Sequence, residues 1–208
     1  MEINSSFYRP HRPETYARWA GSVPDGFRFS VKLPKTITHE KRLAGCEEDV
    51  ARFLSQAGCL GAKLGVLLVQ TPPHLAFSEA AVEAFLRSLR QETGVAIAFE
   101  PRHASWFDGA AEAVFDAFDV ARVAADPALF PGAGEPAGSR RLAYFRFHGT
   151  PELYYSDYPQ DALRVIAERL DTAGRTHEDV WCIFDNTAQG HALGNALEMA
   201  ALCANHGT

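Results

Sequence analysis

Short β-rich runs alternate with longer amphipathic segments along the whole chain. The runs lie at 2–8, 27–33, 64–70, 95–101, 121–127, 142–149 and 180–186. Helical patterns separate and follow them, at 13–23, 47–61, 78–94, 109–120, 161–174 and 191–203. This alternation of strand and helix predicts parallel strands that are joined by right-handed crossovers.

Two α/β architectures fit this pattern, an open doubly wound sheet and a (β/α) barrel. No GxGxxG turn and no Walker A loop follows any run, so the usual signatures of the open sheet are missing. Polar residues instead end nearly every run: Asn4, Lys32, Gln70, Glu100, Arg102, Asp126, Arg146, His148, Asp185 and Asn186. A barrel collects its strand ends in one ring, so we predict a single TIM-like (β/α) barrel domain over 1–208 with seven visible βα units.

Composition narrows the class of protein. The 208 residues are 47% hydrophobic and carry a net charge of −6, which argues against a protein that coats nucleic acid or an anionic membrane. The N-terminal stretch has no signal-peptide core and no run is apolar enough to span a membrane, so we expect a soluble cytoplasmic protein. The four cysteines show no CxxC spacing, and we expect them to be reduced packing residues.

The segment "VAIAFEPRHASW" (95–106) ends a buried run with titratable groups. Glu100 and Arg102 are two residues apart, so on a strand they face the same side, toward the barrel mouth. An Arg beside a carboxylate keeps both ionised, and its fork can also hold a carboxylate or a phosphate. The alternative is a structural ion pair that closes the barrel end.

The segment "YFRFHG" (144–149) repeats this arrangement. Arg146 and His148 share one face of a strand opposite Phe145 and Phe147. Because a histidine can exchange protons near neutral pH, His148 is a candidate general acid or base, although a hydrogen-bonded structural histidine explains it as well.

Lys32 and His39 flank the end of another strand. With the basic residues of 100–102 and 146–148 they would line a positive pocket inside an acidic protein, which favours a phosphate or carboxylate ligand. The alternative is that Lys32 neutralises Glu100 or Asp126 across the barrel. A metal site built from strand-end Glu, Asp and His is the competing interpretation. No paired-histidine motif supports it and the nearby cations would repel a metal, so we expect neither metal nor cofactor.

Aromatic residues accompany the basic ones. Trp106, Tyr154, Tyr155 and Tyr158 could stack on a planar ligand, or they pack loops onto the rim. A nucleotide or nucleic-acid binding module is therefore an alternative function. The net negative charge argues against this alternative. The Pro/Gly-rich segment 127–141 is typical of a mobile rim loop or lid.

Near the C-terminus, Asn186 suits a turn or a helix cap, and His191 and Asn195 lie one helical turn apart on one face. No GxSxG elbow offers a nucleophile. We therefore assign the proton-transfer role to Glu100, His148 and Asp126. The predicted ligand contacts are Asn4, Lys32, His39, Gln70, Arg102, Trp106, Arg146, Tyr158 and Asn186. As an enzyme, the chain would be a metal-independent hydrolase, lyase or isomerase; as a binding protein it would use the same cations, and a protein-interaction module is the third class.

Seven blocks occur in one order along the chain: "EINSSFYRP", "FSVKLPKTITHEKRL", "LVQTPP", "FEPRHASWF", "ADP", "YFRFHGTPELYYSDY" and "FDNTAQGHALGNALEM". In these blocks the sequence resembles the domain of unknown function 72 family, also called YecE-like. The resemblance covers essentially all of the chain. It implies a TIM-barrel-like fold with no established reaction.

One difference from that family concerns the start of the chain. Members begin with a further strand and helix before the "E-x-N-S-x-F-Y" block, whereas here Met1 directly precedes Glu2. The resemblance therefore implies that the usual first βα unit is missing from this sequence. Either the start codon is assigned too late, or the barrel closes with seven strands, or it keeps a gap. An unclosed sheet exposes its edge strands, so we expect a homodimer that pairs through this gap.

Overall fold

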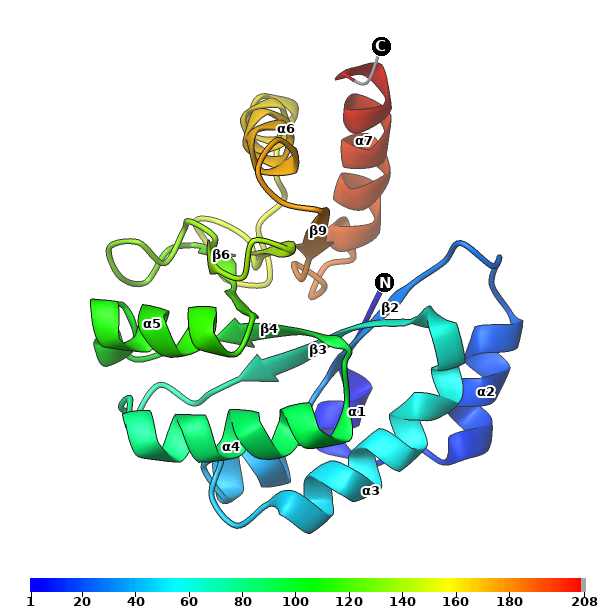
Figure 1. Cartoon of the computed structure of the whole chain (residues 1–208). Helices are drawn as coiled ribbons and strands as arrows, with labels where there is room; N and C mark the ends of the chain where they lie inside the picture. Colours follow the sequence, from blue (N-terminus) through cyan, green and yellow to red (C-terminus); the bar gives the residue numbers. More distant parts are fainter. Residues whose placement is uncertain (207–208) are drawn as a thin grey trace. The chain divides into compact units, whose positions relative to one another are not determined.

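The structure is a computed structural model that describes residues 1–206 (Figure 1). The chain divides into two compact units, Met1–Val120 and Ala121–Thr208, and each unit is described by itself. The predicted single domain stays a prediction. The predicted α/β class with parallel strands is confirmed in both units.

The first unit contains four parallel strands in sequential order. They are β1 (Glu2–Ile3), β2 (Phe29–Lys32), β3 (Leu64–Gln70) and β4 (Ala96–Glu100). Their register pairs Lys32 with Leu68 and Gln70 with Glu100. The polar residues at the carboxyl ends of β2, β3 and β4 therefore lie at nearly the same level of the sheet.

Helices cover one face of this sheet. They are α1 (Ser5–Tyr8), α2 (Pro13–Gly21), α3 (Glu47–Ala57), α4 (Glu79–Glu92) and α5 (Gly109–Ala117), and Figure 1 shows α3 and α4 along β3 and β4. Leu67 and Val69 of β3, and Ile97 and Phe99 of β4, pack into the core beneath these helices. Because side chains alternate along a strand, Gln70 and Glu100 point to the opposite face.

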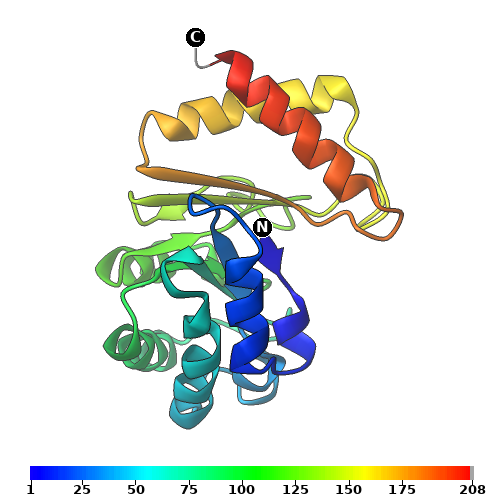
Figure 2. The same cartoon turned by 90° about the vertical axis from the view of Figure 1, so that its right-hand side faces the viewer.

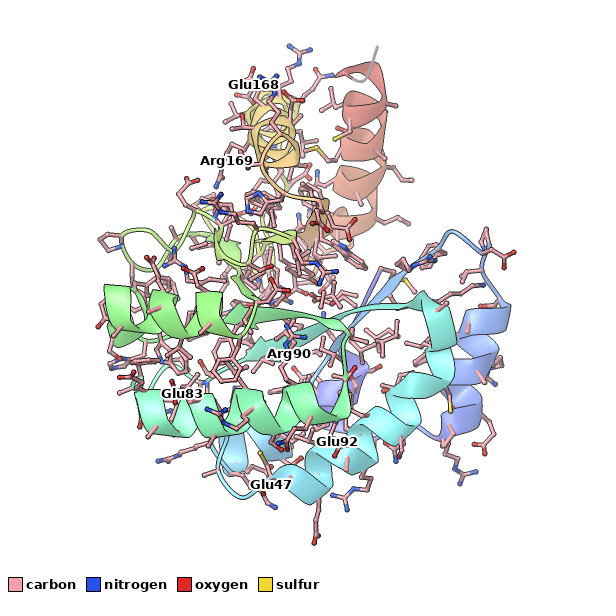
Figure 3. The ribbon with its side chains drawn as sticks, in the orientation of Figure 1. Glu47, Glu83, Arg90, Glu92, Glu168 and Arg169 are labelled. Carbon is pink, nitrogen blue, oxygen red and sulfur yellow. The ribbon has the colours of Figure 1, made fainter. Side chains whose placement is uncertain are left out.

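Arg90 ties α4 to the turn that precedes β5 (Figure 3). Its guanidinium donates hydrogen bonds to the carbonyl oxygens of Val95 at 2.8 Å, Phe118 at 3.0 Å and Asp119 at 2.8 Å. One charged side chain thus satisfies three loop carbonyls and fixes the end of the unit.

The second unit contains a three-stranded parallel sheet and a small antiparallel pair. The sheet has the order β6 (Ala124–Asp126), β8 (Leu142–Phe147) and β9 (Asp179–Phe184), and β5 (Val120–Arg122) pairs with β7 (Ala137–Gly138). Helices α6 (Gln160–Gly174) and α7 (His191–His206) lie on the same side of this sheet in Figure 2. Phe145, Phe147, Leu163, Phe184 and Met199 form its core.

Several predicted elements differ from the observed ones. The run 2–8 gives a two-residue strand followed by α1, in which the hydroxyl of Ser6 donates to the carbonyl oxygens of Ile3 and Lys32. The run 121–127 divides into β5 and β6. Three short helical turns were not predicted: η1 (Thr36–Glu40), which is π-helical, and the 3₁₀ turns η2 (Gly58–Lys63) and η3 (Ala104–Trp106).

The segment 127–141 is more structured than the predicted rim loop. It contributes β7, and the backbone of Ala125 donates to the carbonyl of Ala133 at 2.8 Å. A side-chain nitrogen of Arg122 donates to the carbonyl of Gly132 at 3.2 Å. These bonds fasten the segment to the ends of β5 and β6. Within the described residues, no helix is both long and apolar enough to cross a membrane.

Candidate functional site

A continuous chain of polar side chains joins the carboxyl ends of β2, β3 and β4. The Lys32 ammonium donates to Oε1 of Gln70 at 2.7 Å, and Nε2 of Gln70 donates to Oε2 of Glu100 at 3.0 Å. Nε of Arg102 donates to Oε1 of Glu100 at 2.8 Å. We call these four residues the strand-end chain. It links two cations through one amide and one carboxylate.

Glu100 is the buried centre of the strand-end chain. Its side chain is 1% exposed and that of Arg102 is 15% exposed, and Nη2 of Arg102 also lies 2.8 Å from Oε1 of Glu100. Both carboxylate oxygens thus accept hydrogen bonds, as a buried charge requires. Glu100 is consequently better placed to hold Arg102 and Gln70 than to take a proton from a ligand.

The short helix α1 and the turn η1 surround Lys32. Its ammonium lies 4.3 Å from the centroid of the Phe7 ring, and the same ring meets His39 edge-on at 4.9 Å. The hydroxyl of Thr38 lies 2.8 Å from Nδ1 of His39. The predicted association of Lys32 with His39 therefore has a structural basis.

His39 stands in a positive environment. Burial lowers the pKa of its imidazole, and the positive charges of Lys32, His74 and Arg102 lower it further. Groups that perturb one another in this way lie within effective Coulombic range. In this part of the first unit, Lys32 and Arg102 bring two permanent positive charges and Glu100 brings one negative charge, which gives a local positive excess beside His39.

Thr71 follows Gln70 directly and carries a buried hydroxyl. The residue is 1% exposed, and its backbone N–H donates to the Glu100 carbonyl at 3.1 Å. Among the residues that the structure describes, its Oγ1 has no hydrogen-bond partner. A buried hydroxyl in this condition costs stability, which is a common feature of functional sites.

In the second unit, Asp185 accepts from two basic side chains of β8 and its exit. Nη2 of Arg146 lies 2.9 Å, and Nδ1 of His148 lies 3.1 Å, from the same oxygen, Oδ2. Arg146 is 1% exposed and His148 is 2% exposed. The carboxylate therefore holds the Arg146 guanidinium and orients the His148 imidazole.

Asp126 forms a second carboxylate centre in this unit. Its Oδ1 accepts from the Tyr158 hydroxyl at 2.6 Å and from the Thr150 hydroxyl at 2.7 Å. The backbone N–H of Gly149 donates to the Tyr158 oxygen at 2.9 Å. Burial, followed by the charge and hydrogen bond of Asp126, raises the pKa of the Tyr158 phenol, so Tyr158 remains a donor to the carboxylate. Tyr158 therefore supports Asp126.

Asn186 and Asn195 brace the start of α7. Nδ2 of Asn186 donates to Oδ1 of Asn195 at 2.8 Å and to the carbonyl of Ser156 at 3.0 Å. Nδ2 of Asn195 donates to the Tyr158 carbonyl at 3.1 Å. Asn195 is buried and Asn186 is fully buried within this network.

Trp106 corrects one interpretation of the sequence. The indole is fully buried, packs against Phe99 and Phe115, and donates to the Leu75 carbonyl at 2.7 Å. The turn η3 directs it into the core, so it is not a surface for stacking a ligand. Asn4, half-buried, occupies the position just before α1.

The predicted site residues thus divide between the units. The first unit brings together Lys32, His39, Gln70, Glu100 and Arg102, and the second holds Asp126, Arg146, His148, Tyr158 and Asn186. The single ring of all these residues stays a prediction. Within the described part of the chain, no group of three or more His, Cys, Asp or Glu side chains could hold a metal ion.

Sequence reasoning missed four contributors: Thr71, His74, Thr150 and the carboxylate partner role of Asp185. Thr71, His74 and Thr150 each lie within four residues of a strand end, so extending the strand-end rule into the following loop would have found them. Asp185 was already a strand-end candidate, but without its partners.

A family model described as a protein of unknown function, DUF72, matches residues 1–208. The UPF0759 protein YecE of Escherichia coli (strain K12) is 33% identical over 108 residues, which cover 51% of this chain and 39% of the relative. The chain thus matches less than half of that protein. The UPF0759 protein YunF of Bacillus subtilis (strain 168) is 25% identical, with 97% of this chain and 82% of the relative covered.

Two solved structures share the fold. A DUF72 family protein of Thermotoga maritima matches with a TM-score of 0.83 and 26% identity, covering 98% of this chain and 84% of that one. A DUF72 family protein of Enterococcus faecalis matches with a TM-score of 0.83 and 24% identity over the same shares. These likenesses fit the predicted TIM-like α/β class.

Proposed function

The chain belongs to the DUF72 family of proteins of unknown function, and on this fold we propose that its first unit binds an anionic small molecule at the carboxyl ends of β2, β3 and β4. The proposed ligand carries a phosphate or a carboxylate. Lys32, His39, His74 and Arg102 would supply the positive charge.

One observation carries the proposal: three basic groups from separate segments act on the imidazole of His39. Basic groups held this close repel one another, so the cluster is stabilised by negative charge placed beside it. Glu100 compensates for one charge through its contact with Arg102. An anion bound here would add further compensating negative charge.

The donors suit a phosphate or carboxylate group. Lys32 offers a point charge that Gln70 holds at 2.7 Å, and Arg102 offers a planar guanidinium that Glu100 fixes. The Thr71 hydroxyl adds a buried neutral donor without a partner in the described residues. Charge-assisted hydrogen bonds to such anions are among the strongest in proteins.

Acid/base chemistry is a second function, and Asp126 favours it. Both hydrogen bonds that the Asp126 carboxylate accepts within the described residues are on Oδ1. Asp126 is also half-buried, whereas Glu100 and His148 are almost completely covered. Of the three predicted proton-transfer residues, Asp126 is thus the one best placed to exchange a proton with a ligand.

Ligand screening tests the anion proposal. Thermal unfolding is followed with sulfate, phosphorylated sugars, nucleotides, carboxylic acids and short oligonucleotides, using wild type, Lys32→Met and Lys35→Met. Lys35 is the matched control because it is half-exposed and pairs only with Glu40 in the described contacts, at 3.1 Å. We expect small anions to raise the melting temperature of wild type and Lys35→Met, and of Lys32→Met much less.

Equal stabilisation of Lys32→Met and Lys35→Met would overturn the proposed pocket, as would no response to any small anion. Stabilisation by oligonucleotides alone would support the nucleic-acid alternative.

For the acid/base function, the anions that bind are incubated with wild type, Asp126→Asn and Asp179→Asn and followed for hydrolysis, elimination or isomerisation. Asp179 is an exposed carboxylate of the same unit and serves as the control. We expect turnover to fall at least about 100-fold in Asp126→Asn alone. Unchanged turnover in Asp126→Asn would remove Asp126 from the mechanism.

A further inference from the structure

Helix α7 carries apolar side chains on its outer as well as its inner face. Its inner face buries Asn195 and Met199 against the rest of the second unit. Its outer face leaves Leu193 69% exposed and Leu197 64% exposed. An amphipathic surface helix normally presents polar side chains to water, so an apolar outer face indicates a contact with another apolar surface.

The exposed apolar residues of α7 follow a regular spacing. Leu193, Leu197, Ala200 and Ala204 are all exposed and recur at intervals of four, three and four residues. We call them the α7 stripe. This is the spacing of a helix–helix seam with knobs-into-holes packing. The residues that flank the stripe are all small: Gly194, Ala196, Ala201 and Cys203.

The surface on both sides of α7 is hollow. A cavity of about 610 Å³ is lined by Gly194, Asn195 and Ala201 together with residues before α6. A cavity of about 430 Å³ is lined by Ala196, Ala200 and Cys203 together with residues of α6 and β9. Figure 2 shows α7 as an outer element on its side of the sheet. The stripe thus stands between two hollows, with room for another helix to approach closely.

We propose that the α7 stripe is a self-association surface on which the α7 helices of two copies of this chain pack antiparallel. In this arrangement Leu193 lies opposite the partner's Ala204, and Leu197 lies opposite the partner's Ala200. Each large side chain meets a small one, so the four-residue stripe is complementary to itself. A contact of this kind closes around a two-fold axis.

Charge also favours a second copy at this surface. Two chains of net charge −6 repel each other over most of their surfaces. Within residues 191–204, only Glu198 carries a fixed charge, and it lies off the stripe. The contact is small, since a 16-residue helix is about 24 Å long, so we expect a dissociation constant in the micromolar range.

Sedimentation velocity across a concentration series tests this surface. We expect a monomer–dimer equilibrium for wild type. Leu197→Glu should raise the dissociation constant by about 100-fold or more. Val165→Glu is the control, because Val165 is 57% exposed on the neighbouring helix α6. It should leave the equilibrium unchanged.

Cysteine labelling gives an independent readout on the unmodified chain. Cys203 flanks the stripe, whereas Cys59 belongs to the first unit, and both are exposed free thiols. We expect maleimide labelling of Cys203, followed by mass spectrometry, to slow at high protein concentration. Labelling of Cys59 should not change. The protection of Cys203 should disappear in Leu197→Glu.

Three results would overturn the proposal. They are a wild-type chain that stays monomeric up to about 100 µM, a dimer that Leu197→Glu leaves intact, and equal protection of Cys203 and Cys59. A dimer that Leu197→Glu leaves intact would form through another surface, for example the exposed edge strands at which the sequence predicts pairing. None of these results depends on the anion site in the first unit.

Discussion

Gln70 and Glu100 are direct register partners on the parallel strands β3 and β4, and the Gln70 amide donates to the Glu100 carboxylate at 3.0 Å. The other end of the same amide accepts from Lys32 at 2.7 Å. An amide carries both a donor and an acceptor, so Gln70 can connect a cation to an anion without adding charge. The local positive excess is preserved as a result.

Replacing Gln70 by Leu should weaken both the fold and the site. The change leaves the buried Glu100 carboxylate with one donor fewer and removes the Gln70 acceptor from Lys32. We expect the free energy of unfolding in urea to fall by about 2 kcal/mol, and sulfate affinity by about tenfold. Gln91→Leu, at an exposed position on α4, is the control and should change neither quantity. Unaltered sulfate binding by Gln70→Leu would separate Gln70 from the site.

The imidazole of His39 should couple anion binding to pH. Its pKa is lowered by burial and by the neighbouring cations. The unfolded chain therefore binds this proton more readily. The stability that the neutral His39 imidazole contributes to the folded protein is complete above the unfolded pKa of about 6.5. It is lost as the pH falls through the folded pKa. An NMR titration should show the His39 ring titrating below pH 6.5 in the free protein.

Sulfate should shift this titration in the opposite direction, because a bound anion stabilises the imidazolium. By linkage, sulfate affinity should then rise as the pH falls from about 7.5 to 5.5, a range in which sulfate keeps its charge. If the protein binds sulfate but the pKa of His39 is the same with and without it, the anion binds away from His39.

Arg90 provides a test of stability that is separate from the site. Arg90→Met leaves three loop carbonyls without their charged donor, and we expect a loss of about 3 kcal/mol in the free energy of unfolding. Arg87 is the matched control, since it lies three residues earlier on α4, is 64% exposed and approaches Glu83 only at 4.0 Å. Arg87→Met should cost about 0.5 kcal/mol or less. Similar losses in the two variants would show that the carbonyl contacts do not stabilise the unit.

The sequence was most informative in the strands, where the two-residue alternation determines the face to which each side chain points. The pattern in β3 and β4 places Gln70 and Glu100 on the face opposite Val69 and Phe99, which the structure confirms. The run 2–8 also alternates, but its second half forms the helical turn α1. In this turn the Ser6 hydroxyl donates a hydrogen bond to the Lys32 carbonyl. That bond joins segments far apart in the chain, so no local pattern could show it.

The candidate site was less predictable because loop side chains take their direction from long-range packing. Trp106 follows Arg102 by only four residues, yet η3 turns its indole toward Phe115, in the core. His74 lies beyond two prolines, and only the folded loop brings it into range of His39. Strand-end position identifies which residues are candidates, and the loop conformation decides which of them meet.

Gly149 is required by the turn that follows His148. Its φ is +96°, and a Cβ atom there would lie 3.1 Å from the carbonyl oxygens of both Glu152 and Ser156. Gly149→Ala should therefore lower the free energy of unfolding by about 2 kcal/mol or more. Gly174→Ala is the control, because no heavy atom lies within 4 Å of a Cβ built at that helical position. It should be neutral or stabilise the protein by about 0.5 kcal/mol.

Asp185 should be energetically coupled to Arg146. The two side chains meet at 2.9 Å, and His148 lies 3.1 Å from the same carboxylate oxygen. Asp185→Asn keeps an acceptor but removes the charge that stabilises a buried guanidinium. We expect it to lower the free energy of unfolding by about 2 to 3 kcal/mol. Asp179→Asn, at an exposed position, should cost about 0.5 kcal/mol or less.

A double-mutant cycle distinguishes this pairing from two independent losses. Once Asp185 is neutral, removing Arg146 should cost less than it does in the wild type, because the pair has already been broken. We therefore expect Asp185→Asn and Arg146→Met to be non-additive by about 1 kcal/mol or more in urea unfolding. Additive losses would mean that Arg146 draws its stability from other contacts and that Asp185 does not hold it in place.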